Sequence, residues 1–184
     1  FFDIRKDSLY CDAPTELKRR AYRTVLDIVF HALVRWLSPV LCFTTEEVWA
    51  SRYPDADSVH LLEWPEIEAG WRNTALGDKW ELLRALRTRV TEAIEPMRRD
   101  KIVRSSLEAE VALTLAEPDL LGAVNSVDFD EICIVSGLTA GEGEHDRVAV
   151  ARTENEKCGR CWRHLPEVEE DGALCGRCEE VVNA

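Results

Sequence analysis

The sequence predicts a mainly α protein, in which a helical bundle is followed by a small α/β element and a cysteine-containing ribbon. Three observations support this prediction. Apolar residues recur at three- and four-residue steps through much of residues 1–104. The repeat changes to two-residue alternation within residues 105–150. Residues 151–184 then hold two Cys-x-x-Cys pairs. We therefore expect three parts with these boundaries.

The first expected helix covers residues 15–37. Asp12 and Pro14 suit its start, and Ser38-Pro39 should end it. Its apolar stripe contains Leu17, Ala21, Val25, Ile28, Val29, Ala32, Leu33 and Trp36. Thr44 and Glu47 have capping-box spacing, which predicts a short second helix that ends at Pro54. Residues 59–65 should be extended, because a residue that precedes proline avoids the helical conformation.

A long helix should cover residues 74–103, with a kink at Pro96. Its expected inner stripe is Leu76, Trp80, Leu83, Val90, Ile94 and Met97. After it we expect strands at 108–115, 131–137 and 147–152, a short helix at 119–124 and a loop at 139–146. Single apolar or soft residues elsewhere should be buried: Trp36, Trp49, Trp64, Trp80, His31, Cys11, Cys42 and Cys133.

Charge is unevenly spread along the chain. The net charge of −12 disfavours indiscriminate binding to nucleic acid. Residues 79–104, however, carry eight basic and four acidic groups. Arg98, Lys101 and Arg104 close this segment, and they form either a solvated helix end or a binding patch. No apolar run is long enough to cross a membrane, and the first residues lack the layout of a signal peptide, so they indicate a cut edge inside a longer protein.

Four cysteines have the spacing of a zinc site. Cys158-Gly159-Arg160-Cys161 and Cys175-Gly176-Arg177-Cys178 are near copies, and each can deliver two thiolates to adjacent corners of a tetrahedron. We expect Cys158, Cys161, Cys175 and Cys178 to bind one structural zinc ion, since a complete shell of four thiolates leaves no open position for catalysis. A redox pair, two disulfides, or His164 as a ligand fit the mirrored pairs less well. An odd total of seven cysteines favours a reducing cytoplasm.

Several motifs together resemble a known family. Ser38 to Trp49, with Ser58-Val59-His60 and Trp64-Pro65, resembles the anticodon-binding helical domain of class I synthetases for isoleucine, valine and leucine. Phe2 to Asp12 and Arg104 to Val111 are similar to the isoleucine enzyme. Arg152 to Arg163 is similar to the zinc tail of bacterial isoleucyl-tRNA synthetases.

The resemblance implies a module that binds the anticodon stem-loop of tRNA-Ile as a monomer. ATP and Mg²⁺ would act only in a catalytic domain outside this chain. The His-x-Gly-His and Lys-Met-Ser-Lys-Ser signatures of adenylate formation do not occur here, so we expect no catalytic residue and no ligase activity from the chain alone.

RNA contact is expected at two places. Trp162 can stack on a splayed base, or it can pack over the zinc turn; Arg160, Arg163 and Arg177 lie near it in the sequence. Arg98, Lys101 and Arg104 are the second candidate set. Two other functions stay open, namely a stand-alone zinc ribbon that binds protein or nucleic acid, and a DNA-repair module. The helical motifs around Trp49 and Trp64 argue against both.

Overall fold

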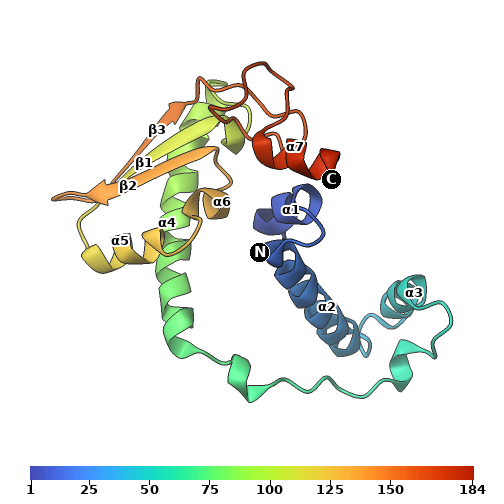
Figure 1. Cartoon of the computed structure of the whole chain (residues 1–184). Coiled ribbons are helices and arrows are strands. Elements are labelled where there is room, and N and C mark those ends of the chain that lie inside the picture. Colours follow the sequence, from blue (N-terminus) through green and yellow to red (C-terminus); the bar gives the residue numbers. More distant parts are fainter. The chain divides into compact units, whose positions relative to one another are not determined.

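The computed structural model describes all residues from 1 to 184. The chain divides into two compact units: one comprises residues 1–13 and 73–184, and the other comprises residues 14–72. Helices dominate both units, which confirms the predicted mainly α class, and a three-stranded sheet accompanies them in the first unit (Figure 1). None of the helices combines the length and the apolar character that a membrane span requires.

The first unit is built around helix α4 (Thr74–Arg99). The Asn73 side chain caps its start by accepting a hydrogen bond from the Leu76 N–H, at 2.9 Å. One face of α4 buries Leu83, Leu86, Val90 and Ile94 against the sheet and two short helices. The predicted stripe is confirmed at its centre, whereas Leu76 is exposed. Helix α4 ends at Arg99, four residues earlier than predicted, because Lys101 takes a left-handed conformation and the Ile102 N–H bonds back to the Met97 carbonyl.

The sheet has the order β2-β1-β3, and β1 lies in the middle (Figure 1). Strand β1 (Ala109–Leu115) pairs in parallel with β2 (Gly137–Glu142) and antiparallel with β3 (Arg147–Arg152). Alternate β1 residues are buried, as the two-residue pattern predicted. Helix α5 (Pro118–Asn125) and helix α6 (Phe129–Cys133) make the crossover that a parallel pair needs.

The prediction for residues 131–146 was wrong. Residues 131–133 are the last part of α6, not the start of a strand, and the second strand lies in the segment predicted as a loop. Helix α6 ends because Ile134 is left-handed, at φ 57°, and the Val135 N–H bonds to the Asp130 carbonyl at 3.0 Å. Val135, which follows α6, is therefore buried in the core without belonging to a strand, and β2 begins at Gly137.

Two helices of the first unit were not predicted: α1 (Phe2–Cys11) and α7 (Gly176–Asn183). Asp12, expected to cap the next helix, instead follows the C-terminus of α1, where its N–H donates to the Ser8 carbonyl. Cys11 and Cys133 are buried as expected.

The second unit contains α2 (Leu17–Leu37) and α3 (Cys42–Arg52). Helix α2 matches its predicted range closely and ends before Pro39. The capping box at Thr44 was wrong, because α3 begins at Cys42 and Thr44 lies inside it. Residues 59–61 form a 3-10 turn, not extended chain.

The core of the second unit is small. Val34, Trp49 and Val59 are its buried members, and the Trp49 indole N–H donates to the Asp57 carbonyl at 2.9 Å. His31 is half-buried and hydrogen-bonds the Tyr53 hydroxyl at 3.0 Å. The predicted burial of Trp36, Trp64 and Cys42 was wrong, since all three are exposed. Helical periodicity predicts which side chains share a face, but not whether a partner covers that face.

Candidate metal centre and the surface around it

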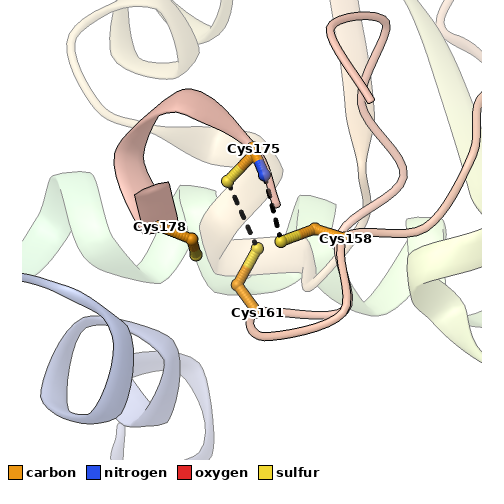
Figure 2. Close-up of side chains that lie close together, drawn as sticks. All are labelled: Cys158, Cys161, Cys175 and Cys178. Carbon is orange, nitrogen blue, oxygen red and sulfur yellow. Dashed lines mark hydrogen bonds between the residues drawn. The ribbon is translucent and has the colours of Figure 1, made fainter. Parts of the chain in front are cut away.

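The four predicted ligands converge on one point (Figure 2). Cys158 and Cys161 lie on one tight loop, where the Trp162 N–H donates to the Cys158 carbonyl at 3.0 Å. Cys175 precedes α7 and Cys178 lies in its first turn. All four side chains are buried, and their sulfur atoms lie within 4.8 Å of one another.

This geometry fits a tetrahedral zinc ion. With Zn–S bonds of about 2.3 Å, two sulfur ligands of a tetrahedron are about 3.8 Å apart. The Cys161 and Cys175 Sγ atoms are 3.9 Å apart. His164 is not needed as a ligand, since its Nδ1 lies 2.8 Å from the Asn155 carbonyl oxygen and its backbone N–H donates to the Ser136 hydroxyl.

Local electrostatics favour a thiolate at one cysteine. Burial acts to raise the pKa of the Cys158 thiol, but N–H groups of Cys161, Cys175 and Arg160 act against burial and bring the pKa down to about 6. Burial raises the pKa of Cys161 and of Cys175. A divalent cation among the four sulfurs would favour deprotonation of all of them.

The two glycines of the cysteine turns have different roles. A Cβ atom at Gly159 would lie 2.3 Å from the carbonyl oxygen of Gly172, so only glycine allows this approach of the two loops. The loops are joined there by hydrogen bonds from Gly159 N–H to the Ala173 carbonyl and from Gly172 N–H to the Lys157 carbonyl. Apart from its chain neighbours and the backbone of its own helix, nothing lies within 4 Å of a Cβ at Gly176, so that glycine is not required by packing.

The arginines of the cysteine turns contact α1. Arg160 donates to the carbonyls of Tyr10 and Cys11, at 3.0 and 2.6 Å. Arg177 donates to both carboxylate oxygens of Asp7, at 2.6 and 2.9 Å, and to Asp12 at 2.9 Å. We call these contacts of Arg160 and Arg177 with α1 the α1 clasp. The guanidinium groups predicted to meet RNA therefore have partners within the chain.

Arg163 also has internal partners. It is paired with Asp130 of α6 and contacts the Ser136 carbonyl. The first cysteine turn is thus tied to α6 and to the chain just before β2, while α7 is tied to α1 through Arg177.

Trp162 has a different environment. The residue is 65% exposed, and its backbone is left-handed at φ 65°, an uncommon and costly conformation for a bulky residue. It lines a pocket of about 500 Å³ with Tyr10 and Lys6 of α1. Tyr10 is 69% exposed. No sequence pattern selects Tyr10, because its position depends on the α1 clasp.

The second predicted set lies together at the end of α4. Arg98, Lys101 and Arg104 are exposed and line one open hollow with Arg99, which was not among the predicted residues. Arg98 is paired with Glu95 one turn earlier, at 3.1 Å. Lys101 is left-handed at φ 59°.

Comparison with known proteins identifies the helical part first. Residues 1–113, more than half of the chain, match the family described as the anticodon-binding domain of tRNA ligase. The chain belongs to this anticodon-binding family. Residues 155–181 of this family member match a second family, the zinc finger found in FPG and IleRS, and this match contains all four cysteines. The match and the sulfur cluster together support zinc binding.

Curated relatives of this anticodon-binding chain are isoleucine–tRNA ligases. The protein of Zymomonas mobilis is 60% identical over 188 residues, which covers 99% of this chain and 20% of the relative. The protein of Agrobacterium fabrum is 51% identical and that of Gluconobacter oxydans 47% identical, over 93% and 100% of this chain. The chain thus spans about a fifth of the length of these relatives.

Proposed function

We propose that this chain is the tRNA-recognition module of an isoleucine–tRNA ligase and that it binds the anticodon stem-loop of tRNA-Ile. The observation that carries the proposal is that an anticodon-binding domain and this type of zinc finger occur on one chain. Attachment of isoleucine with ATP and Mg²⁺ would belong to the rest of the ligase. The alternative, a stand-alone zinc ribbon, does not account for the match over residues 1–113.

The zinc ion in this proposal is structural, one per chain, with Cys158, Cys161, Cys175 and Cys178 as its ligands. Four buried sulfurs would fill the shell and leave no position for substrate. Because all four come from one chain, the site needs no second copy, and this supports a monomer. The seven unpaired cysteines support a cytoplasmic protein.

Trp162 is the residue that we propose to stack on an unpaired base. Its exposure disfavours packing over the zinc turn, and its costly backbone conformation is typical of functional positions. Arg98, Lys101 and Arg104 would neutralise phosphates, since their charges are exposed in one hollow. Arg160, Arg163 and Arg177 already bind groups within the chain. Each guanidinium could contact RNA only if it gave up these partners or bound RNA in addition to them. We therefore propose that these arginines have a supporting role at the edge of the RNA surface.

Binding of tRNA-Ile by the zinc-loaded chain and by the whole ligase tests this function. Base stacking contributes about 1–3 kcal/mol, so Trp162→Ala should weaken binding roughly 5- to 150-fold while zinc content stays at one per chain. Val182→Ala is the control, because it shortens an exposed apolar side chain of the zinc tail that lies outside both matched families. Equal affinity of the Trp162→Ala and parent proteins for tRNA-Ile would refute the stacking role. Equal binding of tRNA and duplex DNA would instead favour the zinc-ribbon alternative.

A further inference from the structure

Helix α1 contributes little to the main core of its unit. Its buried residues are Ser8 and Cys11, and only Ile4 packs against the cluster formed by α4 and the sheet. Cys11 instead belongs to the cluster of the four zinc-site cysteines. The N-terminal half of the helix is tethered elsewhere, by Ile4 and by the ion pair of Arg5 with Glu131 of α6, at 3.0 Å. The C-terminal half of α1 therefore depends on its contacts with the zinc tail.

Arg177 is the central group in those contacts. Asp7 lies in α1 and Asp12 directly follows the helix, and a single guanidinium bonds to both. Asp12 is also fixed by the Ser8 hydroxyl, which donates to its other oxygen inside the protein. Arg177 stands between Cys175 and Cys178, so two metal ligands would hold its backbone.

The α1 clasp also determines what lies beside Trp162. Lys6 and Tyr10 come from α1, whereas Trp162 comes from the first cysteine turn, and all three line the same pocket. If α1 moved away, this pocket would lose one wall.

We propose that Arg177 is a positioning residue that locks α1 to the zinc tail, so that bound metal fixes the pocket that Tyr10 of α1 lines together with Trp162. Its own side chain need not touch RNA. The consequence for RNA rests on the proposed function, whereas the coupling of α1 to the zinc tail does not.

Hydrogen exchange measured by mass spectrometry on the whole zinc-loaded chain tests the coupling. Local stability governs amide exchange, so Arg177→Gln should speed exchange at residues 7–12 by at least about tenfold and leave α4 and β1 unchanged, with one zinc per chain. Arg177→Lys keeps the charge without the planar fork and should give an intermediate rate. Arg147→Gln, at an exposed position in β3, is the matched control.

If Arg177→Gln loses zinc, a second variant with a substitution in α1 still tests the coupling. Asp7→Asn changes the same contact from the α1 side without altering a residue of the cysteine turns, and it should retain zinc while exchange at residues 7–12 accelerates. Parent-like exchange there in zinc-loaded Asp7→Asn would overturn the proposal.

A double-mutant cycle in the whole ligase tests the consequence for tRNA binding. Arg177→Gln should weaken tRNA binding. It should weaken binding little further when Trp162→Ala is already present, because both changes disrupt the same pocket lined by Tyr10 and Trp162. If the losses of tRNA affinity in the two variants were fully additive, Arg177 would not act through the pocket lined by Tyr10 and Trp162. If Trp162→Ala alone has no effect, the proposed RNA contact fails, yet the exchange result still decides the coupling.

Discussion

Removal of the metal by a strong chelator should unfold the zinc tail and loosen α1 while leaving the main core intact. The seven α-helices contain 89 residues, of which α1 contributes 10 and α7 contributes 8. If both helices are lost, the circular dichroism signal at 222 nm should fall by about a fifth. If the tail unfolds without α1, the loss should be about a tenth. The size of the change therefore distinguishes the two outcomes.

The physical reason is the uneven distribution of buried apolar groups. The zinc tail buries Val168 with half-buried Leu165 and Leu174, which is too little to order some 30 residues without metal. Metal binding supplies on the order of 10–16 kcal/mol in zinc-finger peptides. Helix α4 and the sheet, by contrast, enclose fully buried Leu83 and Val90 without help from the tail.

The assay combines circular dichroism with hydrogen exchange, before and after chelation and again after zinc is restored. Exchange should rise in residues 155–182 and 7–12, and it should stay slow in α4 and β1. Loss of more than half of the helical signal would refute the reasoning, because it would mean that the core depends on the metal. An unchanged spectrum would also refute the reasoning, because it would mean that neither α1 nor α7 depends on the metal.

Three further results are expected. Leu83→Ala should destabilise the protein by about 2–5 kcal/mol in urea unfolding, because Leu83 is fully buried, whereas neighbouring Leu82→Ala, 50% exposed, should change stability little. Lys101→Glu should flatten the salt dependence of tRNA binding by about one phosphate contact, and an unchanged slope would remove Lys101 from the interface. Among the thiols outside the zinc site, exposed Cys42 should be alkylated readily at pH 8. Burial raises the pKa of Cys133 to about 12, so its thiolate fraction and labelling should grow about tenfold per pH unit up to that value, and fast labelling of Cys133 at pH 8 would contradict its burial.

Prediction from the sequence succeeded where local pattern and tertiary use agree. The stripe of α4 and the alternation of β1 were predicted because each packs one continuous apolar face onto a core. The region after α5 failed for the opposite reason. Residues 132–135 are rich in β-branched groups and predicted a strand, but β1 pairs with the segment that starts at Gly137. Tertiary pairing decided the outcome there.

The cluster of four cysteines was predictable because the spacing of the two Cys-x-x-Cys pairs alone is typical of a zinc site. The role of the neighbouring arginines was not, since Asp7 lies 170 residues from Arg177 in the sequence. Helix α1 was missed for a related reason. It turns Ser8 and Cys11 inward in place of an apolar stripe, so the usual helical signal is weak.

The same 170-residue separation affects the order in which the protein can be completed during synthesis. Ribosomes add about 5–20 residues per second, so Asp7 is made roughly 10–35 s before the arginine that will bind it. Throughout that interval Asp7 has neither its ionic partner nor the cysteine turn that carries it. Helix α4 and the sheet can meanwhile assemble from residues that are already present. A nascent chain that stops after β3 but before Arg177 can therefore have a finished core and still lack the Arg177 contacts with its N-terminal helix.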